Sequence, residues 1–384
     1  MNLLKRQLDN SQNSILLYRE YQYSLVSYLF KLSFNYLRTL GLDFDPSGYT
    51  ESISKDTTYH TGNYFATNQY KIKLDPNNKD WFLNLTIPDL LDGQFFQLNG
   101  ALYVPGFFIT DSPVIVKKRS ILCYSLFNSL TLFTDDNRAI FLGNNIPISR
   151  FLNIFLDKDE VELACSKDFL NCENLKENKQ VSIAHISTII GVTNPDLDIV
   201  IKKINDIFFD EWTLNLYKEF YNLEYMDINI LIREILFDSI LDRDNRSFID
   251  LHYKRLVFIE YLLNPFFRAI SVASKYTLIG QQPYKLNLNI GDIIKYFFIR
   301  LDKFNFYGIV NGFSGLLDLK ATFKTPNASN ELPIEVSSIH SSYRGKIDVV
   351  SISNTDPGKV VNLVPDQNLR SLKYGIFDFT AELK

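Results

Sequence analysis

The strongest constraint on the fold is a run of apolar and aromatic residues within 13–40. Its members recur every three or four positions, which is the spacing of one helix face: Ile15, Tyr18, Tyr21, Leu25, Leu29, Leu32 and Tyr36. A neighbouring face is also apolar in the second half, so this part of the helix is expected to be buried on most sides. Gly41 follows where a helix C-terminus favours glycine. The sequence therefore predicts one long, core-facing helix over 13–40.

The other patterns predict a mixture of strands and helices. Alternating residues flank the turn-like sequence at 76–78, which predicts a hairpin over 69–88, and 95–108 continues as strand. Helix patterns cover 148–156, 195–222, 226–241, a segment from Ser247 with a kink at Asn264-Pro265, and 292–301. The expected fold class is α+β.

Size and charge limit the range of functions. A chain of 384 residues is long enough for two or three domains. Its net charge of -4 argues against a free-standing nucleic-acid-binding domain, which is usually basic, although a basic patch on a larger assembly remains compatible with it. Cys123, Cys165 and Cys172 have no metal-binding spacing, and their odd number fits a reducing cytoplasm. No apolar run is long enough to span a membrane.

No residue pattern predicts catalysis or metal binding by this chain. The acid pairs Asp196/Asp198 and Asp242/Asp244 could hold a metal, but they fit helix-terminus and turn positions better. The four histidines are scattered, and none lies in a recognisable nucleophile motif. The predicted sets of catalytic residues and metal ligands are therefore both empty.

Two stretches carry the functional signal. The first, 87–115, contains Phe96, Asn99, Gly100, Val104, Ser112 and Pro113. The second, 339–377, contains His340, Gly345, Lys346, Thr355, Gly358 and Leu363. In this order they resemble two consecutive signatures in the N-terminal half of the β subunit of multi-subunit DNA-dependent RNA polymerases. The chain looks like an N-terminal piece of a β subunit that is split, as in the enzymes of giant bacteriophages.

The resemblance implies a multi-domain arrangement. Residues 1–115 and 250–305 would form the protrusion, 116–249 the lobe, and 306–384 the fork region. The chain lacks the aspartate triplet N-A-D-F-D-G-D, so the catalytic Mg²⁺ is expected in a β′-like partner and no cofactor in this chain. The other implied partners are a C-terminal β fragment, a promoter-specificity factor, template DNA and the RNA–DNA hybrid. The implied location is the host cytoplasm, without membrane attachment and with packaging into the virion left open.

The resemblance also selects candidate contacts with nucleic acid. Cations beside glycines suit phosphate oxygens, because the backbone can approach a ligand closely there. The candidates are Arg344, Gly345, Lys346, Gly358 and Lys359 in the second stretch, Lys320 and Lys324 after a candidate fork loop at 312–316, and the basic run Lys117, Lys118 and Arg119. Tyr103 and Asp111 stand where the family has arginines, which weakens the first stretch as a contact.

Three alternatives to the polymerase interpretation stay open. The cations could belong to an ordinary solvated surface. The chain could be a phage structural or interaction protein that keeps a polymerase-like fold without transcription activity. It could also be a helical interaction module whose matches arise by chance. An enzymatic role is expected only within the assembled polymerase.

Overall fold

The structure is a computed structural model of the chain. It describes residues 14–41, 50–60, 63–73, 82–90, 96–98, 101–104, 106–117, 120–133, 136–157, 159–160, 178–193, 196–238, 249–278, 307–308, 320–323, 339–350, 360–364 and 369–379. Helices and largely antiparallel sheets are both present, so the α+β class is confirmed. Within these ranges, none of the helices combines the length and the apolar character that crossing a bilayer requires.

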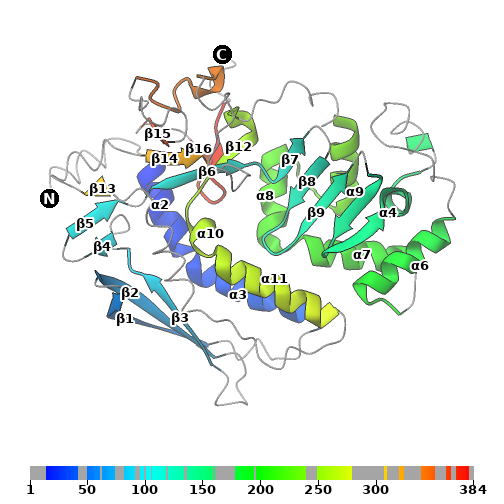
Figure 1. The fold of residues 1–384 in the computed structure, drawn as a ribbon, viewed down its shortest axis with the longest axis horizontal. Helices are drawn as coiled ribbons and strands as arrows, with labels where there is room; N and C mark the ends of the chain where they lie inside the picture. Colours follow the sequence, from blue (N-terminus) through cyan, green and yellow to red (C-terminus); the bar gives the residue numbers. More distant parts are fainter. Residues whose placement is uncertain are drawn as a thin grey trace.

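A first sheet lies on one side of the molecule, at the left and lower left in Figure 1. Its strands are β1 (Thr50–His60), β2 (Asn63–Lys73), β3 (Phe82–Pro88), β4 (Phe96–Leu98), β5 (Ala101–Val104) and β13 (Tyr307–Gly308). The order is β1-β2-β4-β5-β13, and β3 also pairs with β2. The β2–β3 register, from Thr67 opposite Pro88 to Lys73 opposite Phe82, confirms the predicted hairpin.

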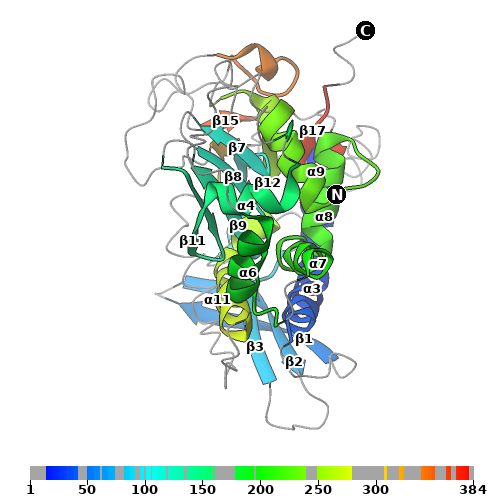
Figure 2. The same cartoon turned by 90° about the vertical axis from the view of Figure 1, so that its right-hand side faces the viewer.

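A second sheet is an antiparallel meander in the order β11-β10-β9-β8-β7. Its strands are β7 (Val114–Lys117), β8 (Ser120–Tyr124), β9 (Ser129–Phe133), β10 (Arg138–Phe141) and β11 (Asn144–Pro147). Figures 1 and 2 show the helices of the same region around it: α4 (Ile148–Phe155), α6 (Lys179–Ile190), α7 (Leu197–Phe208), α8 (Glu211–Tyr221) and α9 (Ile228–Arg233). The region from 114 to 238 is thus a sheet with helices, although its sequence signals favour helix.

A third sheet is assembled from segments that are far apart in the chain, in the order β15-β14-β6-β12-β17-β16. Its strands are β6 (Phe107–Asp111), β12 (Lys254–Val257), β14 (Lys320–Phe323), β15 (Val360–Asn362), β16 (Leu369–Ser371) and β17 (Ile376–Phe377). β14 runs parallel to β6, and the other pairings are antiparallel. Both family-like stretches contribute to this sheet, the first through β6 and the second through β15, β16 and β17. The domain boundaries themselves stay predictions.

Two helices pack side by side through the centre of the molecule, α3 (Val26–Thr39) and α11 (Asn264–Leu278) (Figure 1). The ring of Phe266 on α11 meets Phe30 of α3 edge-on, with centroids 4.9 Å apart. Tyr36 of α3 connects this pair to the second sheet region, since its ring stacks on Phe127 and its hydroxyl donates to the Ile207 carbonyl at 2.7 Å. The core is therefore continuous across the three sheets.

The predicted long helix is two helices, α2 (Ser14–Ser24) and α3, which meet at Leu25. The cause is local. The Ser24 hydroxyl donates to the Tyr21 carbonyl at 2.6 Å, and this carbonyl is the normal acceptor for the Leu25 N–H. The Leu25 N–H bonds instead to the Gln22 carbonyl, one residue closer in the chain. The expected end of the second helix at Gly41 is confirmed by its positive φ of 103°.

Three further helix predictions are wrong in part. The single helix over 195–222 is divided into α7 and α8, because Asp210 caps a new helix by accepting from the Thr213 N–H at 2.9 Å. The helix over 226–241 is α9 followed by a π-helical turn, Glu234–Asp238. The helix from Ser247 is wrong in its first part, where the described residues form a 3-10 helix, Leu251–Tyr253, and the strand β12. Its second part is helical as α10 (Ile259–Leu262) and α11, with a break at Leu263 beside the predicted kink at Asn264-Pro265. The helix expected over 292–301 lies outside the described residues.

Candidate nucleic-acid interface

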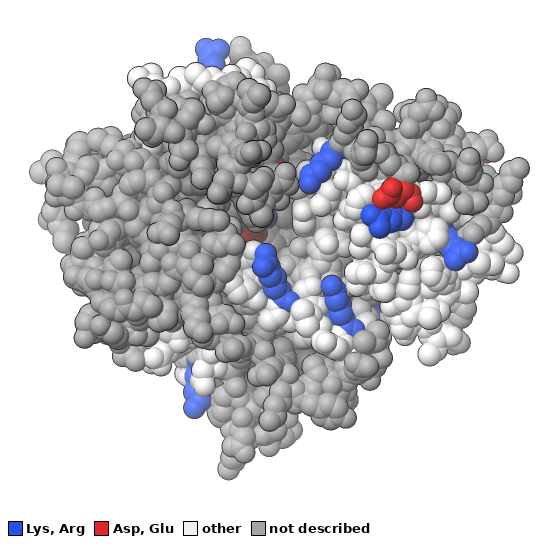
Figure 3. Space-filling view, in the orientation of Figure 1, with Lys and Arg blue, Asp and Glu red and all other residues white. Residues whose placement is uncertain are grey.

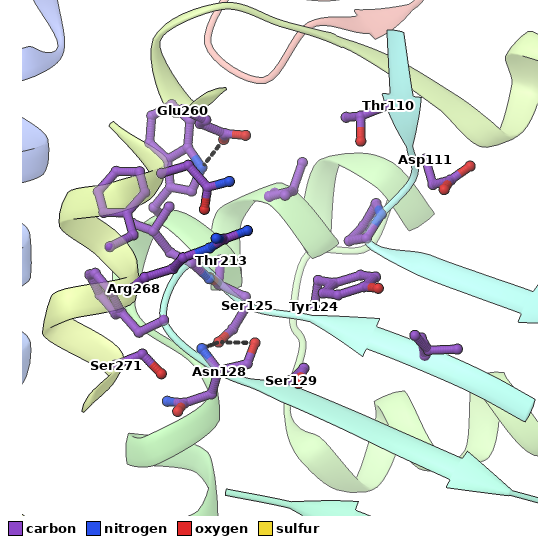
Figure 4. Close-up of a pocket in the computed structure, with 18 of the residues that line it drawn as sticks. Thr110, Asp111, Tyr124, Ser125, Asn128, Ser129, Thr213, Glu260, Arg268 and Ser271 are labelled. Carbon is purple, nitrogen blue, oxygen red and sulfur yellow. Dashed lines mark hydrogen bonds between the residues drawn. The ribbon is translucent and has the colours of Figure 1, made fainter. Parts of the chain in front are cut away.

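A groove with a volume of about 910 Å³ opens between the second sheet and the central helix α11. One wall comes from β7, β8 and β9, the other from β12, α10 and α11, and α8 supplies part of the floor. Figure 4 shows its interior, with Tyr124, Ser125 and Ser129 on the sheet side and Arg268 and Ser271 on α11. The groove is therefore built from two regions, one before and one after residue 250, for which the resemblance predicts different domains.

Exposed cations line both walls. Lys117 lies at the end of β7, while Arg268 and Lys275 lie seven residues apart on α11. This spacing is close to two helical turns, so the two side chains share one face of the helix. Figure 4 shows Arg268 extending from α11 into the groove. Figure 3 shows the lysine and arginine side chains that gather around the central hollow of this face.

Lys275 extends across to the second sheet. The turn between β10 and β11 has positive φ at Leu142 and Gly143, of 56° and 81°. A Cβ on Gly143 would lie 3.5 Å from the Lys275 ammonium, so the turn and the ammonium are close neighbours. The positive charge of α11 is thereby placed at the edge of the sheet.

Both acids among the described residues of the groove are held by cations. Asp111 forms an ion pair with Lys254, which is almost fully buried. Burial lowers the pKa of the Lys254 ammonium, and the charge of Asp111 opposes that effect. Glu260 forms an ion pair with Arg255 at 2.6 Å and accepts from the Trp212 indole N–H at 2.6 Å. These two acids are thus neutralised within the wall, while Arg268 and Lys275 add positive charge to the described part of the groove.

The groove also offers aromatic and hydrogen-bonding groups. Tyr124, at the end of β8, is 42% exposed and lines the groove. Ser125 and Asn128 close the β8–β9 turn, where the Asn128 N–H donates to the Ser125 hydroxyl at 2.8 Å. Cations for phosphates, an exposed ring for bases and polar groups between them are the components of sites for single-stranded nucleic acid.

The structure describes only some of the candidate residues that were selected from the sequence, and it does not place them all at one site. Lys117 lines the groove, whereas Lys118, Arg119, Lys324, Gly358 and Lys359 lie outside the described residues. Lys320 begins β14, and its side chain is likewise outside the description. Arg344, Gly345 and Lys346 are described but do not line this groove. Their contact with nucleic acid stays a prediction.

Arg344 and Lys346 have different surroundings although they are two residues apart. Arg344 is exposed. Lys346 is only 8% exposed, and its ammonium lies 5.2 Å from the centroid of the Phe379 ring. Gly345 between them has a φ of 67°, and nothing in the described part of the chain lies within 4 Å of a Cβ placed there. Of the three, Arg344 and the Gly345 backbone are the groups open to a ligand.

Histidine and carboxylate groups form a small cluster near the second family-like stretch. His340 caps the short 3-10 helix Ser341–Tyr343, and its Nδ1 lies 2.8 Å from the Ser342 hydroxyl. Asp250 lies 2.8 Å from His252 Nδ1 and 3.8 Å from His340 Nδ1. In the described ranges, no group of three or more His, Cys, Asp or Glu side chains could hold a metal ion.

Sequence reasoning missed Arg255, Arg268 and Lys275. The available signal was the spacing of Arg268 and Lys275, but a helical pair of cations is most often a solvated face. Its meaning depends on the opposite wall, more than a hundred residues away in the chain. The chain matches no protein-family model, and no curated protein matches it either.

Proposed function

We propose that the chain is an N-terminal piece of a split β subunit of a multi-subunit DNA-dependent RNA polymerase, and that its groove holds nucleic acid. The chain helps to form the DNA cleft and the side of the active centre next to the RNA–DNA hybrid. A β′-like partner holds the catalytic Mg²⁺. The proposed location is the host cytoplasm, and the proposed partners include the C-terminal β fragment and a promoter-specificity factor.

The groove and its cations carry the nucleic-acid part of this proposal. A net charge of -4 would repel DNA if the charge were evenly spread, so a local excess of cations needs an explanation. Arg268 and Lys275 are exposed around one cavity, while the acids among its described residues are engaged by Lys254 and Arg255. Phosphate binding accounts for this distribution, because cations that contact phosphates release bound counterions.

The family-like stretches support the polymerase part. They are more than two hundred residues apart in the chain, yet β6 from the first lies in the same sheet as β15, β16 and β17 from the second. The two family-like stretches are thus brought together in one sheet. The chain is enzymatic only within the assembly, where it positions nucleic acid.

Binding of a labelled oligonucleotide tests the groove. The variants are Arg268→Ala and Lys275→Ala, and Lys202→Ala of an exposed α7 lysine is the matched control. Loss of a charged hydrogen bond of about 1.5–3 kcal/mol should weaken binding by about one to two powers of ten. The slope of log affinity against log salt should fall by about 0.7–0.9 for each lost contact. Wild-type affinity and slope in both groove variants would exclude the groove as the binding site.

Two competitors define the ligand in that assay. Single-stranded DNA and a duplex of equal length are compared with a mononucleotide. The stacking surface at Tyr124 predicts stronger binding of the single strand. Competition by the mononucleotide alone would indicate a small-molecule pocket, for which the volume of the groove is also suitable.

Affinity purification of the tagged chain from cells that express it naturally tests the polymerase assignment. We expect other large chains in equal amounts, and a complex that extends RNA on a DNA template with Mg²⁺. The isolated chain should not extend RNA. An abundant assembly without RNA synthesis would favour the structural or interaction protein.

A further inference from the structure

The short hairpin at 369–377, formed by β16, β17 and their turn, is held from two sides of the molecule. On one side, the Arg370 guanidinium donates to the carbonyls of Glu219 and Phe220. These carbonyls belong to the last turn of α8, where carbonyls lack partners within the helix. On the other side, the Gln22 amide of α2 donates to the Lys373 carbonyl. The hairpin thus connects α8 to α2.

The Lys373 ammonium lies among three aromatic rings. Its distances to the ring centroids are 4.9 Å for Tyr28, 5.4 Å for Trp212 and 5.4 Å for Tyr374. The rings come from α3, from α8 and from the hairpin itself. Cations are attracted to the faces of such rings, most strongly to Trp. The chain therefore places one of its own lysines in an aromatic cage, between the central helices and the second sheet region.

The hairpin fits closely against β12. The Leu256 N–H donates to the Gly375 carbonyl at 2.8 Å, and a Cβ on Gly375 would lie 2.0 Å from the Leu256 carbonyl oxygen. The hydroxyl of Tyr18 donates to that same carbonyl at 2.5 Å. Any movement of the hairpin must therefore move β12 or break these contacts.

Two routes connect the hairpin to the groove. Trp212 is a wall of the cage, and its indole N–H holds Glu260, which neutralises Arg255. Arg255 is also opposite Ile376 in the β12–β17 pairing. Trp212, Glu260 and Arg255 all line the groove. Both routes end at the same ion pair in the groove wall.

We propose that the hairpin at 369–377 is a latch that sets the geometry of the groove. With Lys373 in its cage, Trp212 is fixed and keeps Glu260 on Arg255, next to the start of α11. With the latch released, Trp212 loses its cation and the Glu260–Arg255 ion pair loses its support, so the wall of β12, α10 and α11 is no longer fixed through Trp212 to α8 at the floor of the groove. The effect on nucleic acid rests on the function proposed above, whereas the latch itself does not.

Coupling of this kind has to be reciprocal. If the docked latch favours nucleic-acid binding, bound nucleic acid must in turn favour the docked latch. Any partner that pulls on 369–377 would then weaken the hold on nucleic acid without touching the groove. This gives the assembly a means of releasing a strand from a distance.

The test uses the full chain with Lys373→Met, which keeps most of the length and removes the charge. Lys373→Arg keeps a cation for the cage, and Lys202→Met is the exposed control. All carry Trp81→Phe, because Trp81 and Trp212 are the two tryptophans of the sequence. The measurements are hydrogen exchange of 369–377, fluorescence of Trp212, and affinity for single-stranded DNA.

We expect Lys373→Met to speed exchange of 369–377, to change Trp212 emission, and to weaken DNA affinity by about fivefold, the lower end of typical couplings. Lys373→Arg and the control should stay near wild type. DNA should slow exchange of 369–377. Faster exchange with wild-type affinity would overturn the coupling, and unchanged exchange would overturn the latch. If the wild type binds no DNA, the proposed function fails, and unchanged Trp212 emission in Lys373→Met still overturns the latch.

Discussion

Asp210 is a helix cap in an apolar place. It lies at the N-terminus of α8, where its carboxylate accepts from the Thr213 N–H at 2.9 Å and from the Thr213 hydroxyl at 2.5 Å. Asp210 is only 5% exposed. Burial raises its pKa from 3.8 to about 6, although the hydrogen bonds from Thr213 favour the charged form. The cap therefore carries a cost of desolvation that depends on pH.

The sign of this dependence follows from the direction of the shift. The folded pKa lies above the unfolded one, so the folded state keeps the proton when the unfolded state has lost it. The contribution of Asp210 to stability is fully present below about pH 4 and is lost as pH rises through about 6. A pKa shift of about two units corresponds to at most about 3 kcal/mol of the free energy of unfolding.

Asp210→Asn should remove this contribution, because Asn also caps helices well and does not titrate. We expect the wild type to lose stability relative to the variant between about pH 4 and about pH 6, with a constant difference above that range. Urea unfolding of both proteins across these pH values measures it. Parallel curves of stability against pH for the two proteins would show that burial does not shift the pKa of the Asp210 carboxyl.

At the scale of elements, local patterns were predicted and long-range pairings were not. The β2–β3 hairpin follows from alternation on both sides of one turn. The sequence predicts helix at β12 because Leu256, Val257 and Phe258 form an apolar run of ambiguous period. The strand instead pairs with β6 and β17, which are distant in the chain. The break at Leu25 depends on which acceptor the Ser24 hydroxyl selects. The pairing of β12 therefore depends on distant residues, whereas the break at Leu25 has a local cause that the helix pattern alone does not reveal.

Two glycines provide a matched test of an element's fit. Gly375 and Gly345 have φ values of 66° and 67°, so alanine meets the same backbone strain at both. Only at Gly375 would the new Cβ collide with backbone, 2.0 Å from the Leu256 carbonyl oxygen.

Gly345→Ala should cost about 1–2 kcal/mol of stability, the cost of a left-handed residue with a side chain. Gly375→Ala should cost clearly more and should loosen the pairing of β12 with β17. Thermal unfolding of the two variants measures the difference. Equal losses would show that the hairpin at 369–377 is not packed tightly on β12.

At the scale of the molecule, the candidate site could be predicted only in part. Lys117 was found in a basic run that adjoins the first family-like stretch. Arg268 and Lys275 were not, because their importance comes from the facing sheet edge at Gly143 and not from their own neighbours. Lys346 was chosen by its match to the family, and the structure adds that it lies against Phe379. Charge in a sequence does not reveal which other charges will face it.

The packing of α3 on α11 should set the stability of the whole molecule. Phe266 is 1% exposed and contacts Phe30 and Phe34 edge-on. Phe266→Ala should lower the free energy of unfolding by about 3–5 kcal/mol. Val272→Ala, at a position on the same helix that is 52% exposed, should change it by less than about 0.5 kcal/mol. Urea unfolding measures the stability of both variants. Similar midpoints would show that the Phe266 contacts do not contribute to the stability of the core.

The third sheet has a consequence for synthesis on the ribosome. The first two sheets consist mostly of strands that are neighbours in the chain, so they can form as soon as those residues emerge. β6 cannot complete its pairings until β12 and then β14 have been synthesised. β14 lies more than two hundred residues after β6 in the chain. Contacts of such high sequence separation form slowly and leave strand edges open meanwhile. We expect the nascent chain to expose β6 to chaperones until β14, its second partner, has been made.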